Sequence, residues 1–210
     1  VVMARNAGVL LSKRFRQGVR PEFKDEGKKR DPVTEADRQS QDYLRQQIEL
    51  QFPSHAILGE EKLDQGGDNP EWIWILDPLD GTTNFMRGFE IYGVSIGLLH
   101  YGQVVAGAIF LAGGQNGKGR VYHARTGGGA HRDGVAISVA KEERLDPTHL
   151  VCLPGNYWKL FKIQSKLKKQ FGEWRGSGSI ANDIALTAEG VFHYALFVAP
   201  KIWDVAAGVL

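Results

Sequence analysis

Apolar residues recur at helical spacing in several stretches of the chain. In one of these stretches Ala36, Leu44 and Ile48 lie at multiples of four residues and form a single apolar stripe, and Thr34 can cap the start of the helix. The pattern predicts helices over residues 1–15, 34–52, 156–171 and 179–189.

Strand patterns occupy the middle and the end of the chain. The continuous apolar run at residues 72–76 predicts a strand that is covered on both faces. The runs at 91–99 and 104–111, joined by a short turn at 101–102, predict a hairpin. Further strands are predicted over residues 120–124, 130–139 and 191–199. Because helices and mostly antiparallel strands come in blocks, we expect layered α+β packing.

The chain has 210 residues and a mass of 23.2 kDa, so we expect residues 1–210 to form a single domain. Its one cysteine, Cys152, excludes an internal disulfide and argues against a disulfide-framed secreted scaffold. No apolar run approaches the ~18 residues of a membrane span, and the N-terminus lacks a signal-peptide pattern. We therefore expect a cytoplasmic protein without a membrane partner.

Charge is distributed unevenly along the chain. Residues 1–30 hold nine basic and three acidic side chains, residues 31–90 hold four and thirteen, and residues 91–210 hold thirteen and eight. Carboxylates as dense as those of the middle segment repel one another unless they face water or share cations. The basic first segment ends in a predicted loop at 21–30 and lacks the interleaved aromatic residues of a nucleic-acid surface. We do not expect nucleic acid as a partner.

The sequence Asp-Pro-Leu-Asp-Gly-Thr-Thr at residues 77–83 follows directly on the predicted central strand. Pro78 has no N–H to donate and is expected to end the strand ladder, so that a tight turn can aim Asp77 and Asp80 at one point. Gly81 permits a strained backbone or a close ligand approach. The threonines after it offer hydroxyl and N–H groups at an expected helix N-terminus, which suits a phosphate. Two carboxylates beside a phosphate need a cation between them, and oxygen ligands favour Mg²⁺.

Each acidic site also has a simpler interpretation when it is taken alone. Glu60 and Glu61 indicate a charged surface, and Asp204 indicates the N-cap of a helix that begins after it. The pair Asp77 and Asp80 indicates an Asx-turn and a helix cap. Together with the apolar strand and the Gly-Thr-Thr sequence, the acids instead indicate a shared cation site.

The segments 59–61, 72–85 and 203–208 resemble the sequence motifs of the inositol monophosphatase family, the Mg²⁺-dependent, lithium-sensitive sugar-phosphate phosphatases. The similarity runs from Asp31 to Gly208. It implies a layered αβαβα sandwich, a homodimer, and hydrolysis of a small phosphate monoester such as an inositol, sugar or polyol phosphate. The attacking water would be activated by Mg²⁺, of which two or three ions are implied.

The resemblance also implies roles for individual residues. The implied metal ligands are Glu60, Asp77, the carbonyl of Leu79, Asp80 and Asp204. Thr82, held by Asp37, would orient and help to deprotonate the attacking water, so that Glu60, Asp37 and Thr82 form the catalytic set. The implied substrate contacts are Asp80, Gly81, Thr82, Gly178, Ser179 and Ile180.

Two features depart from the family pattern. Inositol-cleaving members place an acidic residue seven positions before the motif aspartate, which is Asp204 here, and Phe197 stands at that position. A phenyl ring cannot accept hydrogen bonds from substrate hydroxyls, so fructose bisphosphate, histidinol phosphate and 3′-phosphoadenosine 5′-phosphate stay open as substrates. Only six residues follow Asp204, so we expect a helix of about 9 Å there and a sandwich that lacks C-terminal elements.

Two other interpretations remain open. A haloacid-dehalogenase-type phosphatase needs aspartates two positions apart after an apolar strand, whereas here they are three apart and Pro78 stands where the nucleophile would be. A non-catalytic regulator that binds RNA or protein would use the basic segments 1–30 and 159–169. Phosphate release that depends on Mg²⁺ would distinguish an enzyme from such a regulator.

Overall fold

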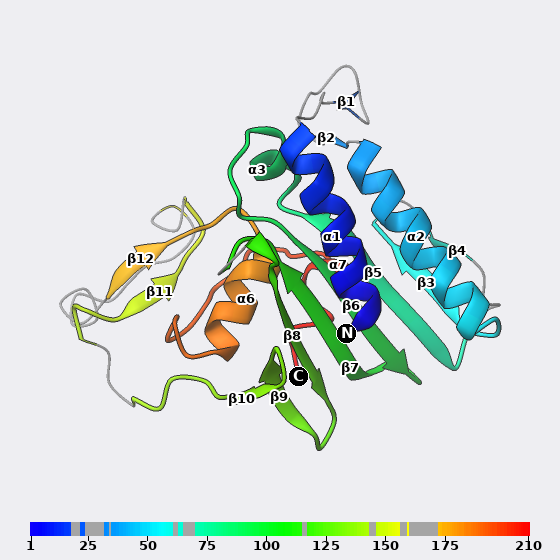
Figure 1. Cartoon of the computed structure of the whole chain (residues 1–210). Coiled ribbons are helices and arrows are strands. Elements are labelled where there is room, and N and C mark those ends of the chain that lie inside the picture. Colours follow the sequence, from blue (N-terminus) through cyan, green and yellow to red (C-terminus); the bar gives the residue numbers. More distant parts are fainter. Residues whose placement is uncertain are drawn as a thin grey trace.

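An eight-stranded sheet with helices on both faces organises the residues that the structure describes (Figure 1). The computed structural model describes residues 1–17, 22–23, 32–33, 35–60, 63–64, 70–114, 117–142, 146–155, 159 and 172–210. Helices α1 (Val2–Gln17) and α2 (Glu35–Gln51) cover one face of the sheet, and α6 (Ile180–Ala188) and α7 (Ile202–Val205) cover the other. The expected layered α+β sandwich is confirmed.

The order of the strands decides which chain segments meet at the edge of the sheet. In space the strands are β10 (Val135–Ile137), β9 (Gly129–Arg132), β8 (Arg120–Arg125), β7 (Gln103–Leu111), β6 (Gly93–His100), β5 (Trp72–Asp80), β3 (Ala56–Gly59) and β4 (Leu63–Asp64). Within this sheet only β3 and β5 are parallel neighbours, with Gly59 opposite Leu76. Their carboxyl ends therefore meet, and Glu60 follows β3 beside the end of β5.

Shorter elements complete the described fold. They are α3 (Thr82–Met86), the antiparallel pair β1 (Glu22–Phe23) and β2 (Pro32–Val33), and the parallel pair β11 (Leu150–Cys152) and β12 (Glu173–Arg175). The β11–β12 pair lies on the side of α6 that is away from the large sheet (Figure 1).

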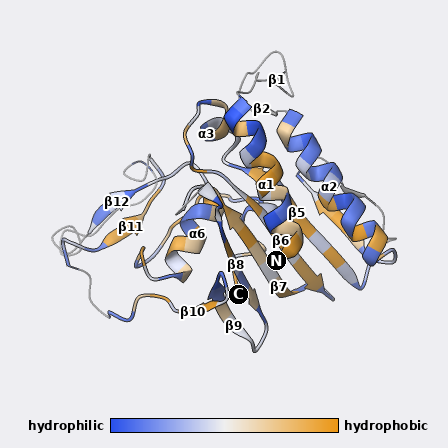
Figure 2. Ribbon diagram, viewed as in Figure 1, coloured by the Kyte–Doolittle hydropathy of each residue, from blue (hydrophilic) through white to orange (hydrophobic). Residues whose placement is uncertain are grey.

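Strand β5 is buried because both of its faces are covered. Trp74 and Leu76 belong to the core under α1 and α2, whereas Ile73 and Ile75 pack with Ala206 on the other face. The alternation follows from the two-residue period of a strand, and Figure 2 shows that the strands are largely hydrophobic. The prediction of a strand covered on both faces is confirmed.

The turn after α7 packs closely against the sheet because glycine faces it. A Cβ atom on Gly107 would lie 2.2 Å from the carbonyl oxygen of Ala207, so no larger residue fits there without a shift of the backbone. The Ser95 hydroxyl donates a hydrogen bond of 3.1 Å to the carbonyl of Trp203. These contacts fix the segment that carries Asp204 against the middle of the sheet.

Several predicted elements are confirmed with small changes in their ends. The predicted helices at 1–15, 34–52 and 179–189 correspond to α1, α2 and α6. The hairpin is β6–β7, and its turn has positive φ at Tyr101 (47°) and Gly102 (76°). No helix among the described residues is long and apolar enough to cross a membrane.

Four local predictions are wrong. The predicted strand at 130–139 is instead a hairpin of β9 and β10, because the chain turns at Asp133 (φ 48°) and Gly134 (φ 86°). The strand at 72–76 does not end at Pro78, because β5 continues to Asp80 through an irregularity in its pairing with β6. Residues 191–199 form no regular strand, because their backbone hydrogen-bonds to β11 only at His193, Tyr194 and Leu196, around a bridge at Ala195, and the chain turns at Ala199, where φ is positive. Asp204 does not cap a following helix of about 9 Å, because α7 begins two residues before it and is only four residues long.

Some predictions fall outside the described residues. They concern the cap at Thr34, Glu61, the predicted loop at 21–30 apart from the two residues of β1, and the helix at 156–171 apart from residue 159.

Candidate active site

The end of β5 forms a bulge that turns two aspartates toward the same side. Asp77 pairs with Ser95 and Asp80 pairs with Gly93, so the stretch from Asp77 to Asp80 is one residue longer than the facing stretch of β6. In a regular strand, residues three apart would point to opposite faces. The Leu79 N–H donates to Asp77 Oδ1 at 3.1 Å and so holds the bulge.

Three carboxylates converge at this bulge. Asp77, Asp80 and Asp204 each offer an oxygen atom, and these atoms lie within 4.8 Å of one another. Asp77 is 4% exposed and Asp80 is 5% exposed. Asp204 arrives from α7, where its Oδ2 also accepts a hydrogen bond of 2.7 Å from the Lys201 N–H. Elements that are far apart in sequence thus supply one compact acidic cluster.

Burial and mutual repulsion perturb these acids strongly. Burial, followed by the charges of Asp80, Glu60 and Asp204, raises the pKa of Asp77 well above its usual range. Burial raises the pKa of Asp80 to about 7, although hydrogen bonds from Ser179 and from the backbone of Ala181 oppose the change. Burial also raises the pKa of Asp204. Burial and mutual repulsion therefore disfavour the charged form of these carboxylates unless a cation balances them.

The donor set fits a hard divalent cation. Asp80 Oδ1 is buried and has no hydrogen-bond partner among the residues that the structure describes. An unpartnered buried carboxylate oxygen is unfavourable, and a cation would satisfy it. Carboxylate and carbonyl oxygens are the ligands that Mg²⁺ prefers.

Glu60 lies near this cluster but outside its tightest part. It is half-buried after β3, and its charge contributes to the raised pKa of Asp77. The group of oxygens within 4.8 Å contains Asp77, Asp80 and Asp204 and does not include Glu60.

The start of α3 brings together the predicted catalytic threonine and its partner. Gly81 has φ of 84° and precedes the helix, a left-handed conformation that favours glycine. The Thr82 hydroxyl lies 3.3 Å from Asp37 Oδ1 and 3.0 Å from the carbonyl oxygen of Leu79. Asp37 reaches this point from the first turn of α2 and is buried.

The predicted segment 178–180 forms the opposite wall. Ser179 caps α6 by accepting a hydrogen bond of 3.2 Å from the Asn182 N–H. The Ala181 N–H donates to Asp80 Oδ2 at 3.1 Å. A Cβ atom on Gly81 would lie 3.3 Å from Ser179 Cβ, so the two walls are in contact. Ile180 begins the helix.

Sequence reasoning missed Asp183 but singled out Phe197, seven positions before Asp204. Asp183 is buried in α6 behind the cluster, and a single acid in a helix gives no sequence signal beyond a favourable charge near the N-terminus. Phe197 lines a cleft of about 460 Å³ together with Ile184 and Val205.

Comparisons with known proteins agree with this geometry. Residues 1–210 match the model of the inositol monophosphatase family. The chain is 30% identical to a fructose-1,6-bisphosphatase/inositol-1-monophosphatase of Aquifex aeolicus, with 100% of this chain and 79% of that protein covered. It is 29% identical to the Nus factor SuhB of Pasteurella multocida, with 99% of this chain and 78% of that protein covered. The crystal structure of the extragenic suppressor protein suhB from Bartonella henselae matches with a TM-score of 0.82 and 29% identity, over 99% of this chain and 80% of that chain.

Proposed function

The chain belongs to the inositol monophosphatase family, and on that premise we propose that it hydrolyses a small phosphate monoester with the help of Mg²⁺. The observation that carries the proposal is the buried group of Asp77, Asp80 and Asp204 beside the start of α3. An anionic phosphate would bind beside these acids only if cations were bound as well.

The proposed metal ligands combine the cluster with its neighbours. They are Glu60, Asp77, the carbonyl of Leu79, Asp80 and Asp204, and we propose that they hold two or three Mg²⁺ ions. When bound, the ions neutralise the phosphate and make water near it more acidic. The orphaned Asp80 Oδ1 supports this proposal, because it needs a positive partner.

The remaining residues would bind the substrate and move a proton. We propose that Thr82 Oγ1 accepts a hydrogen bond from the attacking water and passes a proton toward Asp37 Oδ1, which lies 3.3 Å away. Backbone groups of Gly81 and Thr82 would bind phosphate oxygens, because the first turn of a helix leaves its N–H groups without partners inside the helix. Gly178, Ser179 and Ile180 would line the side on which the rest of the substrate lies.

A panel of substrates tests this proposal. Phosphate release is measured with inositol phosphate, fructose bisphosphate, histidinol phosphate and 3′-phosphoadenosine 5′-phosphate, in Mg²⁺ and in a chelator. We expect release that requires Mg²⁺ and is inhibited by Li⁺. Because Phe197 offers no acceptor for substrate hydroxyls, we expect a substrate other than inositol phosphate to be preferred. The proposal is wrong if no member of a broad panel of phosphate monoesters is hydrolysed.

A second candidate function is a non-catalytic role with a protein or RNA partner. A relative named Nus factor SuhB favours it, and so does the basic face of α1 with Arg5, Lys13 and Arg16. Retention of all four acids Glu60, Asp77, Asp80 and Asp204 favours catalysis instead, because a site under no chemical constraint need not keep them. Tight RNA binding without any phosphate release would support the second function.

Three further statements remain predictions. A single domain over residues 1–210 and a homodimer follow from the family resemblance. A location in the cytoplasm follows from the lone cysteine.

A further inference from the structure

A second buried acid lies one layer behind the carboxylate cluster. Asp183, in the first turn of α6, is 4% exposed. Its Oδ2 accepts hydrogen bonds from the Cys152 thiol (3.1 Å) and the Ser177 N–H (3.5 Å). Its Oδ1 accepts one from the Asn182 side-chain amide (3.2 Å). Burying a carboxylate among neutral donors lowers the free energy of unfolding unless other contacts offset the cost. Stability alone therefore does not explain Asp183, and its position points to a role in the active site.

Ser177 connects Asp183 to both walls of the active site. Its carbonyl accepts a hydrogen bond of 2.8 Å from the Asn84 side-chain amide, which also donates to the carbonyl of Ile91 at 2.8 Å. Its hydroxyl accepts a hydrogen bond of 3.1 Å from the Ser179 N–H. Because Asn84 belongs to α3 and Ser179 caps α6, a shift of Ser177 would move both walls.

The start of α6 in turn holds one carboxylate of the cluster. The Ala181 N–H donates to Asp80 Oδ2 at 3.1 Å. The contact between Gly81 and Ser179 leaves little free space for movement. Asp80 therefore depends on α6 for its position, and the N-terminal end of α6 depends on Asp183.

We propose that Asp183 is a positioning residue of the active site. By tying β11, the loop at Ser177 and the start of α6 together, it fixes the Asp80 carboxylate where a cation binds. This inference rests on the proposed function, but it does not require Asp183 to touch the ion or the substrate. Loss of a residue that orients a metal ligand typically weakens metal binding by about 10- to 100-fold.

The test compares Asp183→Ala with a matched variant, Glu189→Ala, in the full chain. Glu189 lies at the other end of α6 and accepts hydrogen bonds from Tyr122 and Arg132. Its removal also breaks partly buried polar contacts, but far from the start of the helix. The thermal unfolding midpoint is measured against rising Mg²⁺ alone. We expect the Mg²⁺ concentration for a half-maximal shift to rise about tenfold or more in Asp183→Ala and to stay within about twofold in Glu189→Ala.

Cys152 gives a second readout, because it is the chain's single cysteine and is 2% exposed. Its thiol donates to Asp183, so we expect faster reaction with a thiol reagent in Asp183→Ala than in wild type. Asp183→Asn keeps an acceptor oxygen for Cys152 and Ser177, and we expect it to restore most of the Mg²⁺ response. If Asp183→Ala does not fold, Asp183→Leu takes its place, because leucine fills the buried space but offers no acceptor to Cys152 and Ser177. The same tenfold rise in the Mg²⁺ requirement is expected, and an unchanged requirement would overturn the positioning role.

The outcomes separate this inference from the function on which it rests. If wild type responds to Mg²⁺ but Asp183→Ala and Glu189→Ala have the same Mg²⁺ requirement, the positioning role is overturned and the proposed function stands. If the wild-type unfolding midpoint does not respond to Mg²⁺ at all, the proposed function fails and the positioning role fails with it.

Discussion

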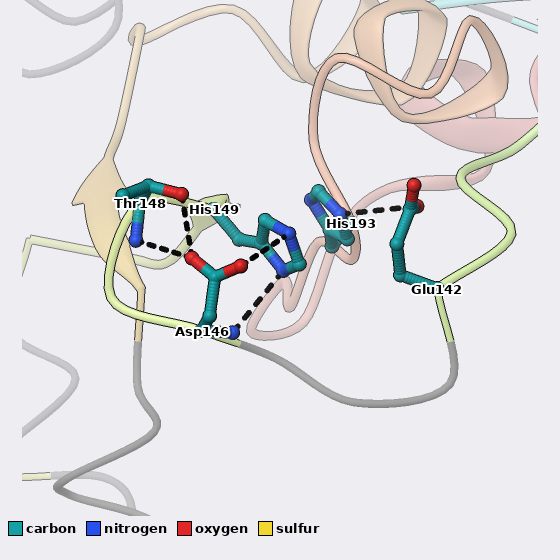
Figure 3. A network of polar contacts seen from close by, with 5 residues as sticks. All are labelled: Glu142, Asp146, Thr148, His149 and His193. Carbon is teal, nitrogen blue, oxygen red and sulfur yellow. Dashed lines mark hydrogen bonds and ion pairs between the residues drawn. The ribbon is translucent and has the colours of Figure 1, made fainter.

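Two polar regions of the molecule both contain aspartate side chains, but the pKa values of these aspartates are shifted in opposite directions. In the proposed active site, Asp77 and Asp80 are buried and lie near other carboxylates. Both effects raise the pKa values of these two acids. In the second region, the rings of His149 and His193 stack with centroids 3.7 Å apart (Figure 3). There the His149 Nε2 atom lies 3.0 Å from Asp146 Oδ2, and the His193 Nε2 atom lies 3.4 Å from a Glu142 carboxylate oxygen.

The two regions differ in charge balance. In the histidine region, the Thr148 hydroxyl and N–H hold the pKa of Asp146 below its usual range, and Asp146 and Glu142 each lie beside an imidazole nitrogen. In the acidic cluster the pKa values of Asp77 and Asp80 are raised. The histidine region places an imidazole nitrogen beside each carboxylate, whereas the acids of the cluster face one another, and we propose that a cation from solution balances them. This contrast indicates a structural role for the histidine region and a chemical role for the acidic cluster.

The largest expected effect comes from neutralising the centre of the cluster. We expect Asp77→Asn to keep the fold and to lower kcat/KM by about 10³-fold or more, because charge stabilisation by a metal is worth several kcal/mol. Phosphate release in saturating Mg²⁺ measures the activity, and circular dichroism checks the fold. Asp146→Asn is the matched control from the histidine region, and its kcat/KM is expected to stay within about twofold of wild type. Near-normal turnover of Asp77→Asn would remove Asp77 from the metal site.

The second prediction concerns stability and pH without metal. The pKa of Asp80 in the folded state is about 7, above the ~3.9 of an unfolded chain. At a pH between these two pKa values, Asp80 is protonated in the folded state and ionised in the unfolded state. Its contribution to the stability of the fold is therefore full at low pH and is lost as the pH rises toward 7. We expect a loss on the order of a few kcal/mol between pH 4 and pH 8 in a chelator. Mg²⁺ should oppose it, because Mg²⁺ binds the ionised carboxylates.

Chemical denaturation of wild type and Asp80→Asn across this pH range isolates the contribution. The amide of Asp80→Asn has no charge to lose, so the stability difference between the two proteins should change with pH in the chelator. A difference that stays constant from pH 4 to pH 8 would contradict the raised pKa of Asp80.

The third prediction concerns the close packing that delivers Asp204. A methyl group on Gly107 would meet the backbone of Ala207, so Gly107→Ala should displace α7. We expect a loss of about 1–3 kcal/mol in stability and weaker Mg²⁺ binding. Gly155→Ala is the control, since a Cβ atom there meets nothing within 4 Å. Equal stability and equal Mg²⁺ binding in both variants would show that close packing does not position Asp204.

The sequence predicts the local part of the active site better than the long-range part. Asp77, Asp80 and Gly81 lie within five residues, so a strand followed by a turn suffices to bring them together. Their actual arrangement is a bulge inside a continuing strand, because pairing with β6 resumes at Asp80 beyond the proline. Spacing alone could not bring in Asp204, and only the resemblance to a family motif placed it with the others.

Tertiary contacts explain what the sequence could not predict. Residues 191–199 have the composition of a strand, yet they pair with β11 only over a few residues around Ala195. His149 and His193 are far apart in sequence and show no recognisable spacing, but β11 and the segment after α6 stack them together. The role proposed for Asp183 likewise depends on donors from three separate segments.

The smallest expected effect comes from the histidine region. Truncation in His193→Ala removes the ring stack and the ion pair with Glu142, and we expect a loss of about 1–2 kcal/mol in stability. His193→Phe keeps an aromatic ring against His149 and should lose less. Both variants should keep kcat/KM within about twofold of wild type and should bind Mg²⁺ normally. If His193→Ala instead lowered kcat/KM tenfold or more in a folded protein, the histidine region would contribute to chemistry, and its internal charge balance would no longer mark it as architecture.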